Sequence, residues 1–209
     1  MTAILLGILL GLRHATDADH VVAVTAIVAR ERSLLRAARI GALWGVGHTL
    51  TLVLVGGAII TFRLVIPPRV GLGLEFGVAL MLIALGYTNL RSTGEPTTER
   101  AAARPFLVGT VHGLAGSAAV ALLVLATIRD TAPAFAYLFV FGLGTIIGMV
   151  TVTVILAAPT LYAGTRIVRL QGGIRLAAGA LSIAFGLLLA RELIVDGGLF
   201  SATPTWEPH

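Results

Sequence analysis

The chain has 209 residues, of which 57% are hydrophobic and 12% are charged. Its mean hydropathy is +0.97. A soluble domain of this length needs far more charged side chains to cover its surface, so the composition predicts an integral membrane protein. No polar stretch is long enough to form a second, water-soluble domain, and we expect one transmembrane domain over residues 1–209.

The charged and sulfur-containing residues exclude several other classes. All 15 basic residues are arginines. They lie in short gaps between apolar runs, which is typical of a chain orientated in a bilayer, so we expect no nucleic-acid partner. Cysteine is absent. That absence excludes disulfides, thiolate metal ligands and the thiol-reductant carriers found among similar six-helix proteins.

Six apolar segments are long enough to span a bilayer, which takes about 20 residues. In chain order they are Ala3–Ala29, Ile40–Ile60, Val70–Leu90, Phe106–Ile128, Ala134–Ala158 and Ile174–Ala190. Glycine and proline predict the breaks between them, at Pro67-Pro68, a polar loop over 92–104, Pro133 and Gly172-Gly173. Glu75, near the start of the third span, is expected to be solvated or to line a vestibule. In the short tail over 196–209, Trp206 is typical of a membrane interface.

The two halves of the chain, 1–91 and 105–195, resemble each other. The matching segments begin at Gly11 and Gly109, at Gly45 and Gly142, and at Gly73 and Gly173, with offsets of 98, 97 and 100. Each half holds three spans, and this odd number inverts the second half in the membrane relative to the first. The sequence therefore predicts an all-α membrane fold of six helices in two inverted three-helix repeats, as in many secondary transporters. The alternative is a chance alignment of glycine-rich helices.

Arginine placement predicts the orientation. Alternate gaps between six spans lie on opposite sides of the membrane, and one set of gaps holds ten arginines while the other holds four. Cytoplasmic loops carry the excess of basic residues, so the larger set is predicted to be cytoplasmic and both termini to lie outside. We expect a multi-pass protein of the cytoplasmic membrane.

Ionisable side chains interrupt the first span. They are Arg13, His14, Asp17, Asp19 and His20. Each formal charge costs roughly 3 kcal/mol at the middle of a bilayer, so these groups must face the interior of the bundle. On a regular helix His14, Asp17 and His20 lie within about 120° on one face, whereas Asp19 points elsewhere unless the helix unwinds locally.

This pattern favours a metal site. Imidazole and carboxylate are ligands expected for nickel, cobalt, zinc or manganese. The alternative is a structural network in which Arg13 pairs with Asp17 and the histidines bond to buried carbonyls. Two histidines and two aspartates within seven residues of a membrane helix favour binding of a divalent transition-metal ion.

Two further histidines can reach the same depth. At about 1.5 Å per residue, His14 lies about 18 Å, His48 about 15 Å and His112 about 10 Å into their spans. A packed structural role for His48 is as consistent with the sequence as a ligand role. His112 matches His14 in the repeat, so we expect it to be functional. Ser117 follows His112 by five residues, about 140° around the helix, which is a poor arrangement for a protease dyad.

The segment RHATDADH, from Arg13 to His20, resembles the His-x4-Asp-His signature of the nickel/cobalt transporter family. Gly47-His48-Thr49 resembles the Gly-His-Ser segment of that family. The resemblance implies metal recognition by His14, Asp17, Asp19 and His20, assisted by His48. Members usually have eight spans and a later acidic segment that this chain lacks. The segment 111–118 is instead similar to short permease-like relatives linked with nickel supply to urease and hydrogenase.

These observations predict a secondary transporter of nickel or cobalt. Its metal-binding residues are predicted to be His14, Asp17, Asp19, His20, His48 and His112, with Arg13, Thr16, Thr49 and Ser117 in support. The ion is then a substrate, and no permanently bound cofactor is expected. The partners are the ion and the bilayer, and homo-oligomerisation is left open. The alternatives are a non-transporting accessory or sensor subunit and a metal-dependent intramembrane enzyme. The short loops suggest no substrate pocket, so we expect no enzyme.

Overall fold

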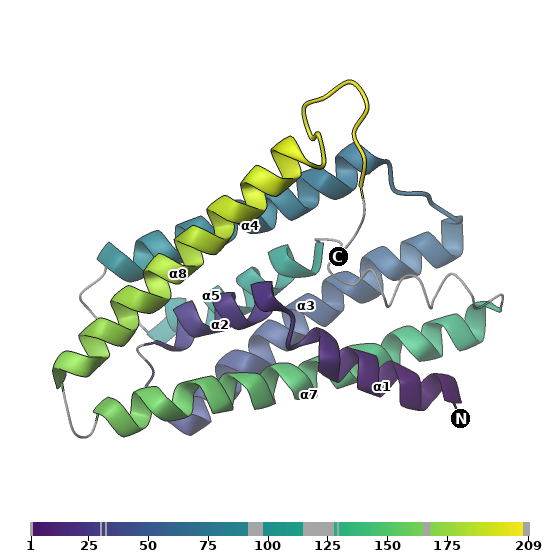
Figure 1. Ribbon diagram of the computed structural model, residues 1–209. Helices are drawn as coiled ribbons and strands as arrows, with labels where there is room; N and C mark the ends of the chain where they lie inside the picture. Colours follow the sequence, from purple (N-terminus) through teal and green to yellow (C-terminus); the bar gives the residue numbers. More distant parts are fainter. Residues whose placement is uncertain are drawn as a thin grey trace.

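The computed structural model describes residues 2–29, 31, 33–91, 98–114, 128, 130–164 and 168–206, and these contain helices and no strand. The helices are α1 (Thr2–His14), α2 (Ala18–Val28), α3 (Leu34–Phe62), α4 (Pro68–Arg91), α5 (Thr98–Leu114), α7 (Thr131–Gly164) and α8 (Val168–Val195) (Figure 1). The all-helical class predicted from the composition is therefore confirmed.

Four helical segments are long and apolar enough to cross a membrane. They are Leu34–Phe62, Pro68–Arg91, Thr131–Pro159 and Gly172–Val195, and they contain the second, third, fifth and sixth predicted spans. The fourth, Phe106–Ile128, begins in α5 and then leaves the described residues. The turn predicted at Gly172-Gly173 is wrong, because α8 runs through both glycines. Likewise α5 begins at Thr98, inside the predicted loop over 92–104.

The single first helix of the prediction is two helices in the structure. α1 ends at His14, and Asp17 is extended, with φ −60° and ψ 147°. In the turn between them, the backbone N–H of Thr16 donates to Arg13 and that of Asp17 to His14. The Thr16 hydroxyl also donates to the Arg13 carbonyl, at 2.6 Å. Threonine and aspartate side chains offer the backbone such local alternatives to a helix, and this explains why the break falls here.

The helices pack in pairs that cross at glycines. α1 lies along α7, α3 contacts both α5 and α7, and α4 lies along α8 (Figure 1). A Cβ on Gly11 would meet the backbone of Phe141 in α7, and one on Gly109 would meet the Trp44 carbonyl in α3. Small residues let backbones approach closely in lipid, where packing and polar contacts replace the hydrophobic drive between helices.

Hydroxyl groups tie the same pairs together. The Thr51 hydroxyl of α3 donates to the Thr110 carbonyl of α5, at 3.1 Å. The Ser182 hydroxyl of α8 donates to the Leu82 carbonyl of α4, at 2.7 Å. Hydrogen bonds of this kind between membrane helices are worth about 0.6 kcal/mol on average, so they specify how the helices align more than they add stability.

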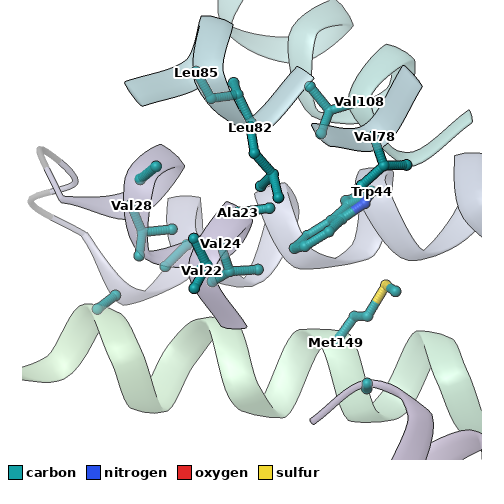
Figure 2. Close-up of a cluster of buried hydrophobic side chains, with 14 residues drawn as sticks. Val22, Ala23, Val24, Val28, Trp44, Val78, Leu82, Leu85, Val108 and Met149 are labelled. Carbon is teal, nitrogen blue, oxygen red and sulfur yellow. The ribbon is translucent and has the colours of Figure 1, made fainter. Parts of the chain in front are cut away.

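The short helix α2 lies at the centre of the bundle, against α4, α7 and α8. Figure 2 shows the apolar core around it, with Ala23 and Val24 near Leu82 of α4 and Trp44 of α3. α2 has only 11 residues. Helices shorter than about 12–15 residues are marginal on their own, so packing on all sides is what holds α2 in place.

After α8 the chain folds back over α4 (Figure 1). The Arg69 guanidinium donates to the Ser201 carbonyl, at 2.9 Å. The Trp206 indole N–H donates to the Glu75 carboxylate, also at 2.9 Å, and its ring covers Gly71. Glu75 is buried. The expectation that it is solvated is therefore wrong, because a residue 131 positions later in the chain supplies its hydrogen bond.

We expect Gly86→Ala to destabilise the pairing of α4 with α8. The added Cβ would lie 2.5 Å from the Gly179 carbonyl oxygen, and a backbone atom cannot move aside cheaply. Overpacking of this kind costs about 1–3 kcal/mol, which thermal unfolding of the purified protein in detergent measures. Gly73→Ala is the matched control on the same helix, because its Cβ meets nothing within 4 Å. Equal melting temperatures for the two variants would contradict the close packing at Gly86.

Candidate metal site

Four histidines from four helices meet where the first span is broken. His14 ends α1, His20 lies in the first turn of α2, His48 lies within α3 and His112 lies near the end of α5. All four are buried. His20 is central, with its ring centroid 4.6 Å from that of His14, 5.1 Å from His48 and 4.2 Å from His112. Histidines far apart in sequence therefore form one cluster.

Hydrogen bonding directs a lone pair of His14 toward His48. The Nδ1 atom of His14 lies 2.8 Å from Asp17 Oδ2. A carboxylate can only accept, so Nδ1 carries the proton and Nε2 carries the lone pair. That Nε2 lies 3.0 Å from His48 Nε2. The arrangement is the one in which a carboxylate orients a metal-binding imidazole from behind.

Asp19 joins the second half of the cluster. Its Oδ1 accepts from the backbone N–H of His20 and lies 2.9 Å from His20 Nδ1. Its Oδ2 lies 2.9 Å from His112 Nε2. Asp19 belongs to the first turn of α2, where the positive end of the helix dipole stabilises a carboxylate. A continuous helix would direct Asp19 away from the cluster, and the break before α2 is what brings it in.

Several buried ring nitrogens of the cluster have no hydrogen-bond partner. They are Nε2 of His20, Nδ1 of His48 and Nδ1 of His112. A buried polar atom without a partner costs about 1–3 kcal/mol, so an apolar bundle keeps three of them together only at a cost in stability. Neutral imidazole binds a metal ion through one ring nitrogen and carries its proton on the other, so each of these rings has a nitrogen without a protein partner that is available to the ion or to the proton.

The described residues contain two groups whose ligand atoms are close enough to hold an ion. One is His14, His20 and His48, and the other is Asp19, His20 and His112. Within each group the ligand atoms lie within 4.8 Å of one another. Nitrogen and oxygen donors in these numbers suit divalent nickel, cobalt or zinc.

Aromatic rings that sequence reasoning missed line the cluster. The Trp44 ring stacks on His20 with centroids 5.7 Å apart and lies 5.8 Å from His112. Phe141 of α7 lies 5.5 Å from His14. Trp44 precedes His48 by four residues and so shares its helix face, which is a signal the sequence offered. Phe141 carries no such signal, because only the packing of α1 on α7 brings it there.

The other predicted residues lie around the cluster rather than in the two groups. Asp17 is 38% exposed and bonds to His14, and it forms no ion pair with Arg13. The Arg13 side chain is exposed and pairs with no acidic group in the described part of the chain. The structural network proposed as an alternative therefore lacks its Arg13–Asp17 pair.

Two of the three remaining predicted supporting residues, Thr16 and Thr49, form hydrogen bonds to backbone carbonyls. Thr16 bonds to the backbone of its own turn. The Thr49 hydroxyl donates to the Gly142 carbonyl of α7, at 3.2 Å, and so joins two helices. Ser117 lies outside the described residues.

Comparison with known proteins identifies a relative of similar length. No family model and no solved structure matches the chain. It is 33% identical over 218 residues to the urease accessory protein UreH of Bacillus sp. (strain TB-90), an alignment that covers 96% of this chain and 95% of the relative. That name describes an accessory protein, which agrees with the prediction that the chain is not an enzyme. The chain therefore belongs to the family of the urease accessory protein UreH, and its resemblance to the short, urease-associated relatives of the nickel/cobalt transporters is confirmed.

Proposed function

We propose that this membrane protein is a secondary transporter that carries nickel or cobalt across the cytoplasmic membrane. One observation carries the proposal: four buried imidazoles converge with the Asp19 carboxylate inside an apolar bundle. Such groups are expensive in a membrane interior, where they mark ion pathways. A hydrated dication that enters the bundle would exchange water for these ligands.

The donor set supports the choice of ion. Imidazole and carboxylate suit nickel and cobalt, and the sequence has no thiolate that would select Cu(I). The relative is named for urease, and the short permeases that the sequence resembles are linked with nickel supply. In this proposal Asp19 and the four histidines bind the ion. Asp17 positions His14, and Trp44 shields the cluster from water.

Symmetric contacts support two inverted three-helix repeats as the transport architecture. Gly86 of α4 packs on Gly179 and Ile183 of α8. In return, Gly186 of α8 packs on Ala79 and Ile83 of α4. The two sets are related by an offset of 100, as a two-fold axis between repeats requires. Repeats of this kind place a substrate site at their interface near the midplane, and rocking of one against the other exposes it to each side in turn.

The arginine count supports an orientation. With ten arginines in one set of gaps and four in the other, the larger set faces the cytoplasm and both termini face outside. α1 then enters from the outside, and α2 continues to the cytoplasmic end. The break between α1 and α2 lies at the depth where an ion from either side would meet the histidines.

A non-transporting accessory subunit is the second candidate, because the relative is named as an accessory protein. Such a subunit would bind the ion in the same cluster and pass its state to a partner. A transport experiment separates the two functions, since a non-transporting subunit adds to the metal content of the cell at most the ion that its own site holds.

We expect cells that express the protein to differ from empty cells in nickel or cobalt content at trace external metal. Raised metal would indicate uptake, and lowered metal would indicate export. His14→Ala should abolish the difference, because it removes a ligand from the cluster. Metal content is measured by mass spectrometry, and the amount of each protein in the membrane is measured in parallel.

The matched control for His14→Ala is His209→Ala, since His209 is the one histidine of the sequence outside the predicted spans. It should leave metal content at the wild-type value. If cells with abundant wild-type protein contain the same nickel and cobalt as empty cells, transport of these ions is ruled out and the accessory function takes its place.

Asp17→Ala should weaken transport without abolishing it. Asp17 acts through His14, and loss of a group that orients a metal ligand typically lowers metal affinity about 10–100-fold. The ion concentration for half-maximal transport should rise accordingly, while the maximal rate stays near the wild-type value. Asp17→Asn keeps an acceptor for His14, so its ion concentration for half-maximal transport should fall between those of the wild type and Asp17→Ala. A lower maximal rate at unchanged half-maximal concentration would contradict this positioning role, and Asp196→Ala serves as an exposed-acid control.

A further inference from the structure

The ligand atoms of the candidate metal site fall into two groups that share one residue. The first group contains three imidazoles, those of His14, His20 and His48. The second contains the Asp19 carboxylate with the imidazoles of His20 and His112. We propose that these are two overlapping ion positions that share His20, and that one ion passes from one position to the other, leaving one nitrogen of the His20 ring for the opposite one. This inference rests on the proposed transport function and describes how the ion moves within its site.

The two nitrogens of His20 serve different surroundings. Its Nδ1 lies 2.9 Å from Asp19 Oδ1, in the second group. Its Nε2 is buried and has no hydrogen-bond partner. The two nitrogens lie on different edges of the ring, so one imidazole can face two positions. His20 also has the shortest centroid distance in the cluster, 4.2 Å to His112, and still lies 4.6 Å from His14.

Spacing inside each group suits ligands of one ion. The Nε2 atoms of His14 and His48 lie 3.0 Å apart. His112 Nε2 and Asp19 Oδ2 lie 2.9 Å apart. Two adjacent ligands at right angles, with metal–nitrogen bonds of about 2.1 Å, are about 3.0 Å apart, so either pair has the spacing of neighbouring ligands. An ion that enters a pair displaces the proton of its hydrogen bond, and the unpartnered Nδ1 of His48 or His112 can take that proton.

The two positions differ in charge and in the elements that build them. The first is made of imidazoles alone and draws on α1, α2 and α3, whereas the second includes a carboxylate and draws on α2 and α5. Two dications on either side of one imidazole repel each other strongly, so only one position is filled at a time. Displacement of α1 relative to α2 at the break would remove His14 from the first position and leave the second complete.

The number of imidazoles around a bound ion tests the inference. Purified full-length protein in detergent is loaded with one equivalent of Co2+, and X-ray absorption counts the imidazoles. We expect at most three in the wild type, three in His112→Ala and two in His48→Ala. Asp19→Asn should give three, because only the first position remains. A single composite site would give four imidazoles in the wild type, three in both histidine variants and four in Asp19→Asn, and this result would overturn the proposal.

Affinity provides an independent measurement on the same samples. His20→Ala damages both positions and should weaken Co2+ binding by at least about 100-fold, while His48→Ala and His112→Ala each leave one position and should lose about tenfold or less. Equal losses for the three variants would contradict a shared residue. His209→Ala is the control and should keep the wild-type count and affinity. Size-exclusion chromatography identifies any histidine variant that does not fold. The affinity of Asp19→Asn, which removes a ligand from the second position alone, is then compared with the wild type in its place.

Transport assays on the same variants keep the two proposals separate. Both His48→Ala and His112→Ala should bind Co2+ yet transport less than a tenth of the wild-type amount, because each interrupts the passage. If the wild type shows the expected imidazole counts but moves no ion, the transport function is excluded and the two ion positions are supported. If the wild type transports the ion but both histidine variants hold it with three imidazoles, the transport function is supported and the two separate positions are excluded.

Discussion

A membrane interior offers ionisable groups no water, so they must satisfy one another, and the rest of the structure follows from this constraint. The first span carries two histidines and two aspartates whose side chains cannot all point in one direction from a regular helix. Breaking the helix after His14 resolves the conflict, because α1 and α2 then present their polar groups to one centre. The exposed backbone of the break is satisfied locally, by the turn that includes Thr16.

The break creates a second requirement, which is support for two short helices. α1 has 13 residues and α2 has 11, lengths at which an isolated helix is marginal. Gly11 lets α1 lie directly on the backbone of α7, and the apolar core around Trp44 encloses α2 (Figure 2). Trp44 thus packs in the apolar core and also stacks on His20. The stability of the bundle and the geometry of the histidine cluster therefore depend on one set of contacts.

Local pattern was enough to find much of the fold and part of the candidate site. Hydropathy located the spans that became α3, α4, α7 and α8, and residue type identified His14 and His20 as a polar cluster. The helix face that His14 and His20 share was predictable, because helical periodicity and residue type are both local properties of the sequence. The repeat added His112, since a match in sequence carries information over a long distance. None of this required knowledge of tertiary contacts.

What could not be predicted depends on long-range packing. Asp19 points into the cluster only because the helix breaks before it, and helix periodicity does not predict the position of that break. Gly172-Gly173 suggested a turn, yet both glycines lie inside α8, where a membrane helix tolerates them. The burial of Glu75 depends on Trp206, which no local pattern links to it. The sequence gives such residues polarity and position but not partners.

The bond between Trp206 and Glu75 also imposes an order on biosynthesis. Trp206 lies 131 positions after Glu75, so α4 is complete while its indole partner has yet to be made. During that interval the carboxylate lacks its indole donor, and Gly71 lacks the ring that covers it. The helices that carry the four clustered histidines, α1, α2, α3 and α5, are translated before this contact exists. Closure of the tail over α4 is therefore a late event in assembly, because Trp206 is made long after α4.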